Sequence, residues 1–148
     1  MIEDRQITLT RLIAAPVDKV WQCWTDPAIL PRWFGPEGYR CHTKDIDLRQ
    51  GGLWRFDMIG PDGTVWANRH RYTKMEPMHL IEFLMDDDGD GDAPFEVVVT
   101  LTPEPAGVRL TQIMTLPTKE ARDGALAFGA DKLGQTTLAK LEAMAATL

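Results

Sequence analysis

Few side chains of this 148-residue chain could do chemistry, and His70 is the first candidate. It alternates with aromatic residues along a predicted strand. A neutral imidazole in an apolar cavity could orient a ligand carbonyl or act as a general base, because burial readily displaces its pKa from about 6.5. The alternative is a core histidine hydrogen-bonded to Tyr72 or Gln112. His42 and His79 have no metal-ligand spacing to it, and no catalytic triad order, nucleophile elbow or phosphate loop is present.

An acidic run at residues 86–92 is the second candidate. Its residues at positions 1, 3, 5 and 6 of a calcium-binding loop are Asp86, Asp88, Asp90 and Gly91. Position 12 is Val97 instead of glutamate, and strands rather than helices are predicted on both sides. We therefore expect a solvated hairpin loop and no metal site.

The elements that must position these candidates follow from the pattern of apolar residues. Alternation predicts a first strand over residues 7–14. Pro16 opens a helix with an apolar stripe, and Asp26 and Pro27 are the predicted N-cap and first position of a second short helix. Six further strands are predicted at residues 39–48, 52–59, 65–75, 80–85, 95–102 and 108–116. A capped helix is predicted over residues 118–147.

This order of elements predicts an α+β fold in which a curved antiparallel sheet surrounds a long C-terminal helix. A single domain spanning residues 1–148 is expected. Gly124, Gly129 and Gly134 each weaken the last helix by up to about 1 kcal/mol relative to alanine. Either they allow close packing of the helix on the sheet, or they leave room for a ligand.

Composition argues against several classes of function. The net charge is −6 with 16 scattered basic residues, which disfavours binding to nucleic acid or to an anionic membrane. The apolar runs are much shorter than the roughly 20 residues that cross a bilayer, and residues 1–10 do not resemble a signal peptide, so a cytoplasmic protein is expected. Cys23 and Cys41 lack metal or disulfide spacing, and no cofactor is implied.

Several short motifs resemble a known family. They are Ala15-Pro16-Val17-Asp18-Lys19-Val20-Trp21, Trp33-Phe34-Gly35-Pro36, Gly51-Gly52 before Trp54-Arg55-Phe56, Asp62-Gly63 and Met75-Glu76-Pro77. The chain resembles the homologues of the activator of the heat-shock-protein-90 ATPase, in the START-like (SRPBCC) superfamily. The resemblance implies a helix-grip fold of the START/Bet v 1 type with an apolar cavity between sheet and helix. Members of that superfamily bind lipids, sterols, polyketides or hormones, and some catalyse reactions there.

Two positions depart from the family's pattern. His70 stands where the family commonly has glycine, two residues before the aromatic Tyr72 of the fourth strand. Leu133 and Gly134 occupy a region where the family often has Gly-Trp. The first change adds a titratable group to the expected cavity, and the second could add volume.

The face of each strand decides which residues line that cavity. The apolar half of one alternating strand is Trp54, Phe56 and Met58. The next strand is expected to present Trp66 and His70 on the same side, whereas a shift of one residue would bury Arg69 and Arg71. Gln112 alternates with apolar residues and should also face inward. The candidate ligand-binding residues are Trp24, Trp33, Trp54, Phe56, Met58, Trp66, His70, Tyr72, Phe83, Gln112, Met114, Leu133 and Gly134.

The leading hypothesis is a small-molecule binding protein with a hydrophobic cavity for a lipid-like, polyketide-like or aromatic ligand, as a monomer or a homodimer. One alternative is a protein-interaction module that binds a chaperone or another protein, which would present an exposed apolar patch. A third hypothesis is a cavity enzyme that uses His70 as acid or base.

Overall fold

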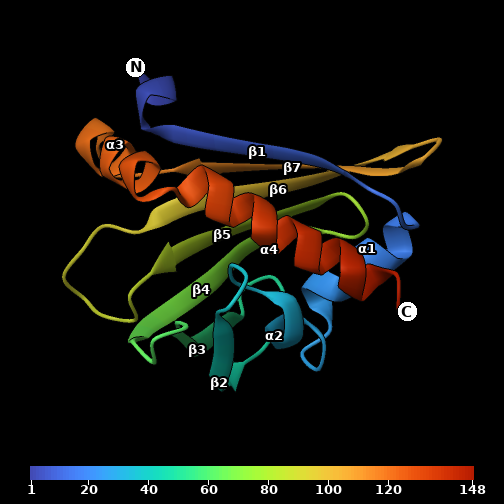
Figure 1. Cartoon of the computed structure of the whole chain (residues 1–148), viewed down its shortest axis with the longest axis horizontal. Coiled ribbons are helices and arrows are strands. Elements are labelled where there is room, and N and C mark those ends of the chain that lie inside the picture. The colour runs from blue at the N-terminus through green and yellow to red at the C-terminus, as the bar shows by residue number, and fades with distance from the viewer.

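The computed structural model describes residues Met1–Leu148 as one antiparallel sheet with helices across one face (Figure 1). The strands are β1 (Gln6–Ile13), β2 (Arg40–Ile46), β3 (Leu53–Ile59), β4 (Val65–Glu76), β5 (Leu80–Asp86), β6 (Phe95–Glu104) and β7 (Gly107–Thr115). The helices are η1 (Ile2–Arg5), α1 (Val17–Thr25), α2 (Leu30–Trp33), α3 (Lys119–Phe128) and α4 (Ala130–Ala145). All seven predicted strands are present, and the helix-grip α+β fold is confirmed.

Six of the seven strands follow one another along the sheet, and β1 joins its end beside β7. The order is β1-β7-β6-β5-β4-β3-β2, and every neighbouring pair is antiparallel. Register shifts between Thr43 and Asp45 in β2 and between Tyr72 and Lys74 in β4 add local bends. Twist and bends together wrap the sheet partly around α4, which crosses its concave face (Figure 1).

The register of β3 and β4 confirms which residues share the inner face. Trp54 pairs with His70, and Met58 pairs with Trp66. Directly paired residues in an antiparallel sheet point to the same side, so these side chains face the helices. Arg69 and Arg71 consequently point to the outer face, and the alternative register that would have buried them does not occur.

Two short helices close one end of the concave face. Val20, Cys23 and Trp24 of α1 are buried, as are Leu30 and Trp33 of α2. The second helix was predicted to begin at residue 27, but residues 27–29 form a turn and α2 begins later. The Asp26 carboxylate accepts the N–H of residue 28 at 2.8 Å, and its backbone carbonyl oxygen accepts the N–H groups of residues 29 and 30 at 3.0 Å, so the turn leads directly into α2.

The C-terminal segment forms two helices, which corrects the prediction of a single long one. Thr118 caps α3 as expected, and its Oγ1 accepts the Ala121 N–H at 3.0 Å. Gly129 then has a φ of 97°, a left-handed conformation that ends α3 and redirects the chain into α4. No helix in the structure combines the length and apolar character that crossing a membrane requires.

Candidate ligand-binding cavity

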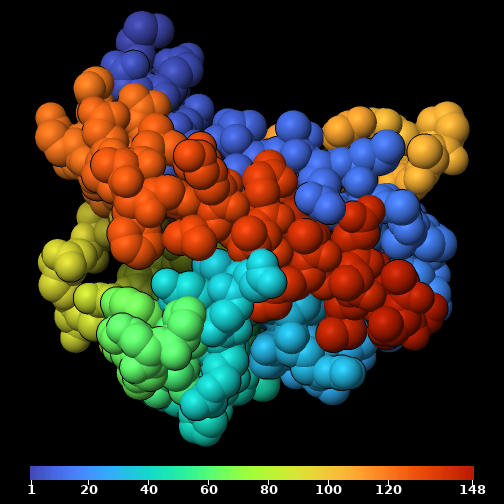
Figure 2. All heavy atoms as spheres, viewed as in Figure 1, coloured from blue at the N-terminus to red at the C-terminus, as the bar shows by residue number.

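A cavity of about 660 Å³ lies between the sheet and the junction of α3 with α4. Nine of its fourteen lining residues are hydrophobic, so it suits an apolar molecule. In the space-filling view its entrance is the hollow between α3, the loop that joins β5 to β6, and the turn that joins β3 to β4 (Figure 2). A second cavity of about 260 Å³ continues inward, between α4 and strands β1 and β7.

The two cavities adjoin each other, because five residues line both of them. The residues that line both are Pro36, Met58, Met85, Phe128 and Leu133. The outer cavity is open at its mouth, and the inner one extends along the underside of α4. A ligand longer than the outer cavity could therefore extend inward past these shared side chains.

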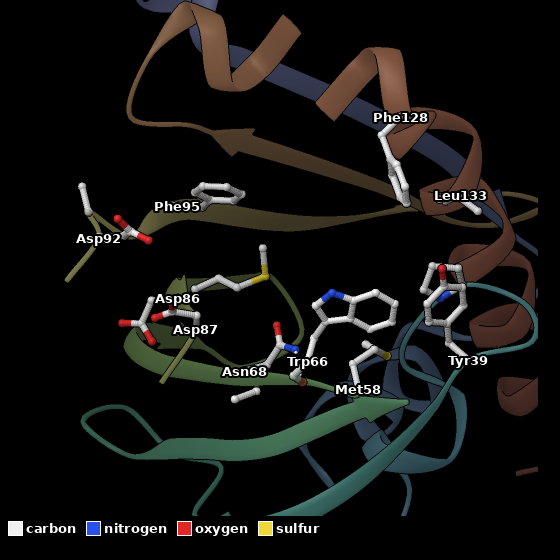
Figure 3. Close-up of a pocket in the computed structure, with 14 residues that line it drawn as sticks. Tyr39, Met58, Trp66, Asn68, Asp86, Asp87, Asp92, Phe95, Phe128 and Leu133 are labelled. Carbon is white, nitrogen blue, oxygen red and sulfur yellow. Dashed lines mark hydrogen bonds between the residues drawn. The ribbon is translucent and has the colours of Figure 1, made fainter. Parts of the chain in front are cut away.

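Aromatic side chains surround the outer cavity. Trp66 of β4 lies across the space from Phe128, which points from the end of α3 toward the sheet (Figure 3). Trp66 is 45% exposed and Phe128 is 72% exposed, values that are high for side chains of this size. The Tyr39 ring lies beside the Trp66 indole, with centroids 5.9 Å apart. Gly60 permits this position, because a Cβ there would lie 2.9 Å from the indole.

The inner cavity is lined by four of the predicted residues on β7 and α4. Gln112 and Met114 of β7 and Leu133 and Gly134 of α4 contribute to its wall. A Cβ at Gly134 would overlap the Leu9 side chain of β1, so this glycine allows the helix to approach the sheet closely. Gly134 therefore serves the packing of α4 and also lines the cavity, which joins the two explanations left open by the sequence.

The loop of residues 35–39 forms one wall of the cavity and is hydrogen-bonded to α4. The Nζ of Lys140 donates to the carbonyl oxygens of Gly35, Pro36 and Tyr39, at 3.0, 3.3 and 3.5 Å. The Thr136 hydroxyl accepts the backbone N–H of the same loop at residue 37, at 3.0 Å. The pKa of Lys140 is lowered, chiefly by burial, and the smaller opposing effects of Cys41 and Glu37 do not offset this. Through Pro36 and Tyr39, this attachment sets the shape of the cavity.

Seven of the predicted binding residues lie in the packed core and do not line either cavity. They are Trp24, Trp33, Trp54, Phe56, His70, Tyr72 and Phe83. Phe34 enters from the loop after α2 and packs edge-on against Trp54 and His70, at centroid distances of 5.4 and 5.1 Å. Alternation places the strand members of this set on the inner face, as predicted. Side chains of α1 and α2 pack over these core residues, so no cavity forms beside them.

His70 is enclosed by aromatic rings and is 1% exposed. It stacks on Phe83 with centroids 4.4 Å apart, and its Nε2 has no hydrogen-bond partner. Neither Tyr72 nor Gln112 bonds that nitrogen, unlike the predicted core arrangement. Burial lowers the pKa of His70 from 6.5 to about 3, against a smaller opposing effect of Asp86. The imidazole is therefore neutral at physiological pH and has no contact with either cavity.

The acidic run forms the loop between β5 and β6 at the mouth of the cavity. Burial alone would raise the pKa of Asp86, but the hydrogen bonds and charges of Arg69 and Arg71 outweigh it and lower that pKa. Asp88 pairs with Arg55 at 2.9 Å. Ion pairs with these arginines therefore engage the carboxylates at positions 1 and 3 of the calcium-loop pattern. The structure contains no group of three or more His, Cys, Asp or Glu residues arranged for a metal ion.

Sequence reasoning missed lining residues on loops and at a helix end, and also one apolar residue each on β5 and β6. The lining residues that were not predicted include Pro36, Tyr39, Met85, Asp87, Asp92, Phe95 and Phe128. Gly129 was a usable signal, because a glycine that ends one helix and begins another indicates a change of direction at the side chain before it. Met85 continues the alternation of Ile81 and Phe83 in β5. Phe95 begins the alternation of Val97 and Val99 in β6, so this pattern indicated the inner face for both lining residues. No periodic pattern extends over the loop positions, so the sequence contains no comparable signal for them.

The curved antiparallel sheet, the helix across its concave face and the apolar cavity between them define a START-like (SRPBCC) domain. A model of the family "Activator of Hsp90 ATPase homolog 1-like protein" (AHSA1) matches residues 14–146, nearly the whole chain. The chain therefore belongs to this family, as its motifs predicted. No curated protein gives a significant match.

Solved structures of bacterial proteins share this fold. A protein from Mycobacterium smegmatis is 29% identical, with a TM-score of 0.84, and the match covers 97% of this chain and 92% of that one. A Rhodobacter sphaeroides protein is 27% identical, with a TM-score of 0.85 and coverage of 98% and 95%. The AHSA1-like protein from Aeromonas hydrophila, at 23% identity, has a TM-score of 0.74 and coverage of 93% and 92%. Because its sequence identity is low, the similarity to the Aeromonas hydrophila protein supports the fold alone.

Proposed function

We propose that the protein binds an apolar or aromatic small molecule in the cavity between the sheet and the α3–α4 junction. The observation that carries this proposal is the cavity of about 660 Å³, because side chains as apolar as Trp66 and Phe128 border it and remain partly exposed. Leaving such side chains in contact with water costs free energy that a bound apolar molecule would recover. The volume is in the range of ordinary small-molecule sites.

The same geometry bears on the two alternatives. An enzyme that uses His70 as acid or base needs this side chain in reach of the ligand, and it lies outside both cavities. A protein-interaction module needs an exposed apolar patch, and Trp66 and Phe128 are exposed. Because both side chains line the cavity, ligand binding accounts for their exposure without a protein partner. Small-molecule binding is therefore the function that these observations favour.

The test uses N-phenyl-1-naphthylamine, a neutral apolar dye whose fluorescence rises in apolar surroundings. Saturable binding with one dye per chain is expected. Leu133→Trp should weaken it at least tenfold, because Leu133 lines both cavities and a larger side chain there fills their junction. The matched control is Leu126→Trp on α3, since Leu126 is exposed and lines neither cavity. Thermal unfolding of each variant verifies its folding.

Indole resonances in a ¹⁵N-labelled sample locate the bound dye. The Nε1–H of Trp66 should shift on titration, because its ring lines the outer cavity. The Nε1–H of Trp33 should stay in place, because it is buried and donates to the Cys23 carbonyl oxygen at 2.9 Å. The proposal fails if no dye binds to the folded protein, or if Leu133→Trp binds it as tightly as the native chain does.

A further inference from the structure

The charge of the cavity narrows the class of ligand, and this inference rests on the proposed function. The charged residues in its lining are all acidic: Asp86, Asp87 and Asp92. No lysine, arginine or histidine lines the outer or the inner cavity. The apolar cavity is the binding site, and the carboxylates at its edge favour a ligand of positive charge.

Two of the three carboxylates are free to act on a ligand. Asp86 is engaged by Arg69 and Arg71 at 2.7 and 3.0 Å. Asp87 and Asp92 form no ion pair. Asp87 accepts only a backbone N–H of its own turn, at 3.1 Å. Both free carboxylates lie at the same end of the cavity, beyond Trp66 from Tyr39 (Figure 3).

Other polar and aromatic groups of the cavity also favour a positively charged ligand. The face of Trp66, which lies between the two carboxylates and Tyr39 (Figure 3), carries negative electrostatic potential that attracts a cation placed near it. Asn68 donates its amide N–H to the Trp66 carbonyl at 3.0 Å and lines the cavity, so its Oδ1 can accept a proton donor. An anionic head group would find no cationic partner in the lining, and burial without one is costly.

We propose that the cavity selects an apolar molecule that carries a protonated amine. The apolar body lies between Trp66 and Phe128 and extends toward the inner cavity, and the amine lies at the mouth beside Asp87 and Asp92. A fatty acid of the same length is disfavoured, because its carboxylate would meet the same two aspartates. Alkylamines, including those that carry an aromatic ring on the alkyl chain, are therefore the ligand class.

The test compares three probes with the same twelve-carbon chain, below their aggregation limits at pH 7. Dodecylammonium is cationic, dodecanol is neutral and dodecanoate is anionic, and each displaces the naphthylamine dye in low salt. The cation should bind about fivefold more tightly than the alcohol, and the anion more weakly than the alcohol. The preference should shrink in 0.5 M NaCl, because salt screens charges at an open mouth.

Charge-matched double variants assign this preference to the mouth. Asp87→Asn with Asp92→Asn should bring the cation and the alcohol within twofold of each other. Asp18→Asn with Asp45→Asn removes the same number of charges from exposed positions outside the lining and away from the loop at the mouth, and it should leave the preference intact.

Each outcome decides between the two proposals. If the alcohol binds and the cation binds no better, the charge selection is wrong while the proposed function stands. A preference that survives in the variant of Asp87 and Asp92 also overturns the assignment. If none of the three probes and no dye binds, both proposals fail together.

Discussion

The buried imidazole of His70 should make the protein lose stability as the pH falls, through a single identifiable group. The pKa of His70 drops from 6.5 to about 3 on folding, chiefly because burial disfavours the charged ring. A base with a depressed pKa binds protons more readily in the unfolded chain, so acid favours unfolding. The stabilisation is present above pH 6.5 and is lost progressively as the pH falls from 6.5 toward 3.

The size of the effect follows from these two pKa values. Between pH 7 and pH 5, the unfolded chain gains about three quarters of a proton at this position while the folded chain gains almost none. The corresponding loss in the free energy of unfolding is about 2 kcal/mol. His70→Phe keeps an aromatic ring that can stack on Phe83. It removes the titrating imidazole and also removes the buried Nε2, which has no hydrogen-bond partner.

The assay is urea unfolding followed by tryptophan fluorescence at pH 7, 6 and 5. The difference in free energy of unfolding between the native chain and His70→Phe should change by about 2 kcal/mol over this range, in favour of the variant at low pH. Any constant packing cost of the larger ring cancels in that change. His42→Gln removes an exposed imidazole from β2 and should follow the native chain. Equal pH slopes for the native chain and His70→Phe would refute the reasoning.

Two further predictions concern the C-terminal helices, and urea unfolding measures both. Gly129→Ala should destabilise by about 1 kcal/mol because of its φ of 97°, whereas Gly124→Ala should stabilise by about 0.5 to 1 kcal/mol, because a Cβ in that helix interior meets open space. Lys140→Met should cost about 1 to 3 kcal/mol, because three carbonyl oxygens lose a charged donor, and hydrogen exchange should quicken in residues 35–39. Unchanged exchange in that loop would mean that Lys140 does not hold it.

The fold was predictable because its elements follow periodic patterns. Alternation in β3 and β4 gave both the strands and the inward faces of Trp54 and His70, which the register confirms. The break at Gly129 was not predicted, because apolar spacing on either side of it is compatible with one helix. The backbone conformation of Gly129, with its positive φ, divides the segment.

The candidate site was predictable mainly where a strand or α4 supplies it. Met58, Trp66, Gln112 and Met114 lie on strands, and the structure places them at the cavity, together with Leu133 and Gly134 of α4. Alternation says which face a residue takes, but it does not say what covers that face. Trp54 and His70 share the inner face with Trp66, and their surroundings differ because the segment from α1 to Phe34 covers one end of the sheet only.

This unequal covering explains why the protein has a cavity at one end and an aromatic core at the other. Side chains of Trp24, Trp33 and Phe34 come from two consecutive short helices and the loop after them, and Phe34 packs over Trp54 and Phe56 of β3. The opposite end receives no such helix. There the chain turns at Gly129 instead, and Phe128 stands over the opening. The binding site is thus the half of the concave face that the helices leave open, and its mouth takes its acidic character from the loop between β5 and β6.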